Sequence, residues 1–395
     1  LGTLRTREME HAAQVLGITQ YWLSTGPDDT IFDFGFSKSG DETLAHWGEE
    51  RTLQRFVTIL RDERPDIVCP TFLDIPGQHG HHRAMTRAAF KAVVLAADPA
   101  AFADIGLPAW QVKKLYLPAW SGAGDSYDDD VPPPRPTVNI DGTGSDPVLG
   151  ADYAQIAQWS RAFHKSQGMG RWSEPGLANI WPLHMAWSVS GETRNESSVL
   201  EGLPATLNDL AGFAGAPEIH DDLSAAQAAI EAAIGAFPHD QRIVGHALKA
   251  LDHIAQARAS CPAAAQVEVE HRLRAKERQL THVIALASGI GARLWFSDDT
   301  VRPGGSLTLS LDLHAPGFEV TSELVLPQDW QATKWQNGTC EVTIPPGAAP
   351  GNPYPDRWFP DRANSPVYVK LVWHVGDQRL SMPVEPEERL QILPR

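Results

Sequence analysis

A chain of 395 residues with 42% hydrophobic and 21% charged side chains is long enough for about two or three globular domains. Its formal net charge of −16 repels polyphosphates and anionic lipid surfaces, so neither nucleic acid nor an anionic membrane is an expected partner. The sequence lacks the ~20 consecutive apolar residues of a membrane span, and its three cysteines lie too far apart for a metal knuckle.

Helices and short strands alternate in the first hundred residues or so. The expected elements are a helix at 1–16 closed by Gly17, a strand at 18–23, a helix at 49–63, a strand at 67–70 and a helix at 80–97. Such alternation is typical of α/β layers, and the apolar run at 67–70 suits a parallel strand covered on both faces. We therefore expect a layered Rossmann-like sheet with helices on both faces.

The rest of the chain changes its periodicity twice. A strand at 138–141 and a helix from about 153 to 163 still belong to the first pattern. Residues 222–288 have long helical periodicity and predict two or three packed helices, whereas the segments 307–313, 341–344 and 367–373 alternate apolar and polar side chains. We expect three domains: an α/β domain at 1–195, a helical connector at 196–290 and an antiparallel β-sandwich at 291–395.

The run Gly77-Gln78-His79-Gly80-His81-His82-Arg83 comes shortly after the apolar strand at 67–70. Three imidazoles within four residues are hard to explain by core packing, because each buried ring nitrogen needs its own partner. In α/β sheets, ligands bind beyond the carboxyl ends of the strands, which is where these histidines fall. The run indicates a metal or acid–base site, with a solvated histidine-rich loop as the alternative.

Four further polar residues are candidates for the same site. Asp74 can orient a histidine or bind a substrate hydroxyl, or it can simply form the turn before Ile75. Arg5 and Glu8 are an i,i+3 pair that either supports the site or lies exposed on the first helix. His164 follows an apolar helix face and is either a structural histidine or a residue at the rim of the pocket.

Taken in order, three segments resemble the LmbE-like, or PIG-L, family of zinc-dependent de-N-acetylases, and together they cover residues 1 to about 195. They are Arg5-x-x-Glu8…Ala12-Ala13…Leu16-Gly17, then Arg64-Pro65-Asp66…Asp74…Gly77-Gln78-His79-Gly80-His81-His82-Arg83-Ala84, and Phe163-His164-Lys165-Ser166-Gln167. The resemblance implies that His82 binds one zinc ion and that His79 is catalytic, with its imidazolium stabilising the oxyanion or protonating the leaving amine. His81 stands where the family often has aspartate, and it is expected to point away from the other two rings.

The chain departs from the family in one respect. Members of the family begin with a strand that ends in His-Pro-Asp-Asp-Glu, which supplies two zinc ligands and the general base, and no such segment is found here. Gly26-Pro27-Asp28-Asp29 echoes that motif without its histidine, and we interpret it as a turn. Because the chain also opens on Leu1, we expect an amino-terminally incomplete copy whose zinc site is incomplete, and which is inactive alone.

The expected function is a metal-dependent amidohydrolase that removes an N-acetyl group from a small or glycan substrate of the N-acetylglucosamine type. The alternative is a non-enzymatic carbohydrate-binding or scaffold protein that retains the deacetylase shell. In the expected sandwich, the aromatic side chains of Trp330, Trp335, Tyr354 and Trp358 can stack on sugars, and core packing explains them equally well. The sequence leaves the compartment open, with the sandwich tail favouring an extracytoplasmic location.

Overall fold

The computed structural model describes residues 2–120, 131–169 and 179–394. Contacts divide the chain into two compact units: Leu1–Gly202 with Pro353–Trp358, and Leu203–Asn352 with Phe359–Arg395. The short segment Pro353–Trp358 therefore packs with the N-terminal part of the chain although it lies in the C-terminal part of the sequence. Among the described residues, no helix combines the length and the apolar character that crossing a bilayer requires.

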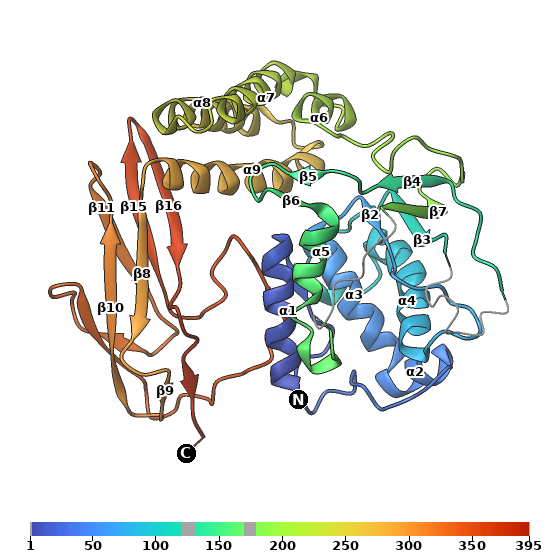
Figure 1. The fold of residues 1–395 in the computed structure, drawn as a ribbon, viewed down its shortest axis with the longest axis horizontal. Helices are drawn as coiled ribbons and strands as arrows, with labels where there is room; N and C mark the ends of the chain where they lie inside the picture. The colour runs from blue at the N-terminus through green and yellow to red at the C-terminus, as the bar shows by residue number, and fades with distance from the viewer. Residues whose placement is uncertain (1, 121–130, 170–178, 395) are drawn as a thin grey trace. The chain divides into compact units, whose positions relative to one another are not determined.

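The first unit is a mixture of helices and short strands (Figure 1). Its helices are α1 (Gly2–Leu16), α2 (Gly40–Trp47), α3 (Glu49–Glu63), α4 (Gly80–Ala97) and α5 (Tyr153–Arg161), with 3₁₀ turns η1 (Ala103–Ile105) and η3 (Lys165–Gln167). Its strands are β1 (Gln20–Tyr21), β2 (Ile67–Val68), β3 (Lys114–Pro118), β4 (Val138–Asp141), β5 (Ser145–Asp146), β6 (Ala151–Asp152), β7 (Ile180–Ser188) and β14 (Arg357–Trp358). The helices expected at 1–16, 49–63 and 80–97 are confirmed.

The main sheet of this unit has the strand order β2-β3-β7-β4. β2 and β3 run parallel, with Ile67 opposite Lys114, whereas β7 runs antiparallel to both β3 and β4. A mixed α/β architecture is thus confirmed, but the parallel Rossmann layering is not. The reason is β7, which the sequence did not reveal and which takes the place beside β3 that a further parallel strand would occupy.

Different parts of the chain pack against the two faces of this sheet. Figure 1 shows α3 and α4 beside this sheet. Leu115 of β3 packs into a core with Val57 of α3 and Ala92 of α4, so these two helices cover one face of the sheet. The next residue, Tyr116, points to the opposite face, as the alternation along a strand requires. There it packs with Met185 and other apolar side chains, among which is Val199 from the segment after β7.

A buried arginine binds the C-terminal end of α4. Arg61 of α3 is only 1% exposed, and its guanidinium donates hydrogen bonds to backbone carbonyls at and just beyond the last turn of α4. The acceptors are the carbonyl oxygens of Leu95 (3.2 Å), Ala96 (3.2 Å), Asp98 (2.7 Å), Ala101 (2.9 Å) and Phe102 (3.4 Å). A cation at this position satisfies carbonyls that a helix end leaves unpaired and complements the helix dipole.

The second unit combines helices with antiparallel strands. Its helices are α6 (Leu207–Phe213), α7 (His220–Gly235), α8 (Asp240–Ser260) and α9 (Gln266–Ala287), with a 3₁₀ turn η4 (Pro217–Ile219). Its strands are β8 (Gly291–Phe296), β9 (Thr300–Val301), β10 (Ser306–His314), β11 (Val320–Val325), β12 (Gln331–Ala332), β13 (Thr339–Thr343), β15 (Tyr368–Val375), β16 (Gln378–Val384) and β17 (Gln391–Ile392). The packed helices expected within 222–288 are confirmed, as is a strand-rich C-terminal region.

Two antiparallel sheets, with the orders β12-β13-β10-β8 and β11-β15-β16, make up most of this region. Leu309 of the first sheet and Trp373 of the second belong to one buried cluster, and Ile284 of α9 belongs to it too. α9 lies next to α8 in Figure 1 and also contacts β16. Helices and strands of this unit therefore share a single core.

The four aromatic residues for which sugar stacking and core packing were both considered lie in two different units. Trp330 and Trp335 are partly buried against the core of the second unit. Tyr354 and Trp358 belong to the first unit, where Trp358 lies in β14 opposite Gln20 of β1. These placements fit the packing interpretation of the four side chains, and sugar contact remains a prediction.

Candidate functional site

The histidine run lies at the end of the loop between β2 and α4 and in the first turn of α4. His79 is the N-cap of α4, and Gly80, His81 and His82 form the first turn. The imidazole rings of His79 and His82 stack, with centroids 5.9 Å apart and planes inclined by 16°. Residues three apart lie on one face of a helix, so the helix start itself brings these two rings together.

His82 is partly buried at the start of α4. It lies against the ring of Phe72, with a centroid distance of 3.8 Å. Burial lowers the pKa of His82, and the neighbouring His79 and His81 lower it further. The environment therefore favours the neutral imidazole of His82, which is the form in which an imidazole can bind a metal ion.

His81 points in another direction. Its ring lies 4.8 Å from that of Phe34 and 5.4 Å from that of Trp47, and its Nε2 is 3.9 Å from a carboxylate oxygen of Asp33. Within the described residues this nitrogen has no hydrogen-bond partner. His81 therefore helps to pack the loop before α2 against the start of α4.

Gly80 allows α4 to begin close to that loop. Its backbone N–H donates to the carbonyl oxygen of Ser37 at 2.7 Å. A Cβ atom at this position would lie 2.5 Å from the carbonyl oxygen of Ser39 and 2.8 Å from the hydroxyl oxygens of Ser37 and Thr43. Only glycine fits without displacing these atoms, and its neighbours in sequence are the histidines of the run.

Gly80→Ala is expected to lower the free energy of unfolding by about 1–3 kcal/mol, because the added methyl group forces backbone and side chains apart. The measurement is urea denaturation of both proteins. Gly245→Ala is the matched control, since Gly245 is an exposed helical position of α8 with nothing near its missing Cβ. That variant is expected to gain about 0.5–1 kcal/mol. Equal stability changes in the two variants would contradict the steric argument.

Asp74 is held by two arginines of α4. Arg83 donates from Nε to one carboxylate oxygen at 2.7 Å, and Arg87 donates to the other. Burial raises the pKa of Asp74, but these hydrogen bonds outweigh it and the pKa lies below its usual value. Among the contacts described, Asp74 joins its loop to α4 through arginines and not through an imidazole.

Arg5, Glu8 and His164 come together although 159 residues separate Arg5 from His164. Arg5 donates to the carboxylate of Glu8, and its Nη1 lies 3.4 Å from Nδ1 of His164. Ser166 donates to the same carboxylate from its backbone N–H at 2.6 Å and from its hydroxyl at 2.7 Å. The three candidate residues thus form one cluster between α1 and η3.

Contacts within this cluster shift the pKa values of Glu8 and His164. Burial raises the pKa of Glu8, but the hydrogen bonds from Ser166 and Arg5 bring it below its usual value. Burial lowers the pKa of His164, and the Arg5 guanidinium adds to this effect. Arg5 therefore faces an ionised carboxylate and an imidazole whose neutral form is favoured.

The segment Gly26-Pro27-Asp28-Asp29 is a turn, as expected, with the N–H of Asp29 donating to the carbonyl oxygen of Gly26 at 3.3 Å. The Asp29 carboxylate accepts from Arg55 at 2.6 Å and from the backbone N–H and the hydroxyl of Thr25. Its role among the contacts described is to close this loop.

The aromatic surroundings of the histidines were not anticipated. Phe72, Phe34 and Trp47 contact the rings of His82 or His81, and the exposed Phe36 meets the ring of His79 edge-on at 5.4 Å. The local signal for Phe34 and Phe36 was the density of aromatic residues at 31–36, whereas Phe72 and Trp47 had no such signal.

A catalytic zinc ion of the kind that the family resemblance implies needs three protein ligands. In the described part of the chain, no group of three or more His, Cys, Asp or Glu side chains is placed to hold a metal ion. His79 and His82 supply two imidazoles whose rings stack. The described residues therefore do not make up such a site by themselves.

The fold and the histidine pair together define a mixed α/β domain with a candidate ligand site beyond the carboxyl end of a parallel strand. Comparison with known families is more specific, because residues 1–93 match the family described as PIG-L, GlcNAc-PI de-N-acetylase. Residues 1–93 are thus a PIG-L family domain, which confirms the resemblance for that part of the chain, while the segment 163–167 lies outside the match.

Curated relatives point the same way. A 1D-myo-inositol 2-acetamido-2-deoxy-alpha-D-glucopyranoside deacetylase of Geodermatophilus obscurus is 34% identical over 122 residues, which are 29% of this chain and 40% of that protein. A deacetylase 2 of the same description from Saccharopolyspora erythraea is 33% identical over 138 residues, covering 33% of this chain and 47% of that protein. The chain thus spans less than half the length of these relatives.

Proposed function

We propose that this chain belongs to an N-deacetylase that hydrolyses the acetamide of an N-acetylglucosamine-type sugar or glycoconjugate. The observation that carries the proposal is the stacked pair His79 and His82, which opens α4 within the residues that match the PIG-L family. The names of the relatives supply the substrate class, since they describe deacetylases of a 2-acetamido-2-deoxy-glucopyranoside.

Amide hydrolysis requires attack of water on the carbonyl carbon, stabilisation of the resulting oxyanion and protonation of the leaving amine. We assign the last two tasks to His79, because an imidazolium can donate to either the oxyanion or the nitrogen. His82, with its lowered pKa, is the residue we propose as a zinc ligand. Zinc, when bound in such enzymes, polarises the carbonyl and acidifies water, and a site of this class requires further ligands from outside the described residues.

The proposal is tested on the full-length gene product. We expect that protein to bind zinc and to release acetate from N-acetylglucosaminyl-inositol or another N-acetylglucosamine derivative, as measured by metal analysis and an acetate assay. The coding sequence upstream of Leu1 is a further test. A His-Pro-Asp-Asp-Glu segment there supports the enzyme, whereas a start codon directly before Leu1 supports the scaffold alternative. A protein that neither binds zinc nor releases acetate would refute the deacetylase.

A further inference from the structure

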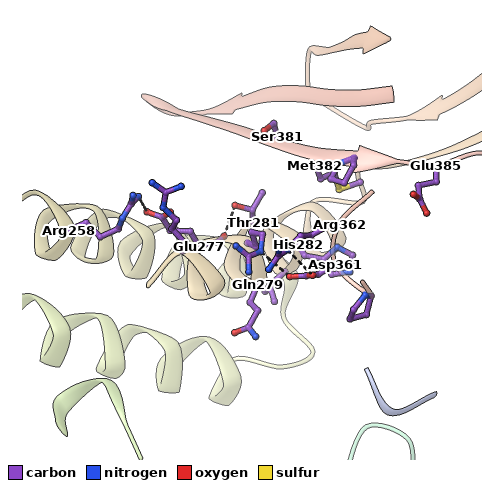
Figure 2. A pocket seen from close by; sticks show the side chains of 15 residues that line it. Arg258, Glu277, Gln279, Thr281, His282, Asp361, Arg362, Ser381, Met382 and Glu385 are labelled. Atoms are coloured by element: carbon purple, nitrogen blue, oxygen red, sulfur yellow. Dashed lines mark hydrogen bonds and ion pairs between the residues drawn. The ribbon is translucent and has the colours of Figure 1, made fainter. Parts of the chain in front are cut away.

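The second unit contains a cavity of about 970 Å³ that the proposed deacetylase does not use. It lies between α9, strand β16 and the loop that starts at Pro360 (Figure 2). Thr281 and His282 on α9 lie near Asp361 and Arg362 of the loop, while Ser381 and Met382 come from β16. A cavity of this size suits a small molecule.

Arginines outnumber carboxylates by one in the lining of this cavity. Arg258, Arg274, Arg278 and Arg362 all line it, against the carboxylates of Glu277, Asp361 and Glu385. Four guanidinium groups at one cavity stand out in a chain whose formal net charge is −16. The cavity is therefore the place in this unit to look for an anionic ligand.

Arg278 and Arg362, on either side of Asp361, have guanidinium nitrogens that donate no hydrogen bond within the described residues. Arg278 donates from Nε to Asp361 at 3.1 Å, and its terminal nitrogens have no hydrogen-bond partner among the described residues. The guanidinium of Arg362 lies over the ring of Phe359 at 4.2 Å. Its Nε is 3.8 Å from Asp361, too far for a hydrogen bond, and no described residue accepts one from it.

The carboxylates that line the cavity already have partners within the protein. Asp361 lies between Arg278 and Arg362, with one oxygen toward each. Glu277 accepts from Arg258 at 2.7 Å, and Glu385 accepts from the backbone N–H groups of Asn364 and Ser365. The cavity thus offers more charged donors than its own acceptors engage.

We propose that this cavity binds the phosphate group of a small phosphorylated molecule, held by the free guanidinium nitrogens of Arg278 and Arg362. A planar guanidinium matches two phosphate oxygens at once, and a phosphate has enough oxygens to serve both arginines. Gln279, Thr281 and Ser381 line the same cavity and offer polar groups to the rest of the molecule.

The test is calorimetric titration of the full chain with inorganic phosphate at constant ionic strength, and then with glucose 6-phosphate against glucose. We expect saturable 1:1 binding of phosphate, tighter binding of glucose 6-phosphate and no binding of glucose. In the double variant R278Q/R362Q the affinity is expected to fall about tenfold or more, because charge-assisted hydrogen bonds are lost. The single variant Arg362→Gln is included because it breaks no hydrogen bond of the described structure, and it is expected to weaken binding with an unchanged thermal unfolding midpoint.

Arg293→Gln is the matched control. Arg293 is exposed, lies over the ring of Trp295 and pairs with Glu387 outside the cavity, so its loss is expected to leave phosphate affinity unchanged. The proposal is overturned by the absence of saturable phosphate binding, or by equal affinities of the wild type and R278Q/R362Q. Binding only to vesicles that contain phosphatidic acid, with none to free phosphate, would also overturn it and would indicate a lipid surface.

Discussion

His82→Ala in the full-length protein is expected to lose both bound zinc and acetate release, whereas His79→Ala keeps the zinc and loses about 10²–10⁴-fold in kcat. The two residues are neighbours on one helix face, so the contrast depends on their roles and not on their location. His82 is the residue proposed as a zinc ligand, its lowered pKa favours the neutral imidazole, and removing a ligand is expected to remove the metal. The measurements are zinc content after gel filtration and steady-state acetate release.

His220→Ala serves as the control for this pair. His220 is an exposed histidine at the start of α7, beside the fully exposed Asp221. Its replacement is expected to change neither zinc content nor turnover. Zinc retained by His82→Ala would show that the ligand assignment is wrong, and zinc lost from His79→Ala would show that both rings bind it.

Glu196→Ala is expected to lower the free energy of unfolding by about 3–5 kcal/mol, because it leaves a buried ammonium group without its counter-charge. The Glu196 side chain is 1% exposed and accepts from Nζ of Lys114 at 2.8 Å. It also accepts from the hydroxyl group of Tyr116. Lys114 is itself buried and keeps only the carbonyl oxygens of Val199 and Glu201 after the change.

Urea denaturation measures this effect. Glu192→Ala removes an exposed carboxylate from the same segment and is expected to change stability by less than about 0.5 kcal/mol. Glu196→Gln keeps an acceptor for Tyr116 but loses the charge, so an intermediate loss is expected. A loss below about 1 kcal/mol for Glu196→Ala would mean that Lys114 relaxes to water and that the ion pair does not hold this segment.

Helices with a clear apolar stripe could be predicted from the sequence, and α3 matches its expected range of 49–63. α2 could not, because an eight-residue helix has little periodicity and its start depends on Ser39 as a cap. β7 contains Pro182 and pairs antiparallel across a long sequence interval, so local pattern did not reveal it. Its position is what separates the observed sheet from the parallel one expected.

In the candidate site, too, some residues could be found from the sequence and others could not. His79 and His82 were found because they are three apart in sequence, so that one helix turn suffices to pair them. Arg5, Glu8 and His164 were suggested only by the order of family-like segments, since no local pattern joins α1 to η3. The contact of Glu196 with Tyr116, which lies 80 residues earlier, had no sequence signal at all.

The anchoring of α4 by Arg61 has a consequence for motion. One end of α4 bears the histidine pair, and the other end is tied by five carbonyl contacts to a side chain of α3. Fraying from the C-terminal end would strip a buried guanidinium of its acceptors, which makes partial opening there costly. The backbone amides of α3 and α4 are therefore expected to exchange their hydrogens with solvent as one cooperative block. His79 and His82, at the start of α4, then keep their positions for as long as α3 and α4 stay packed together.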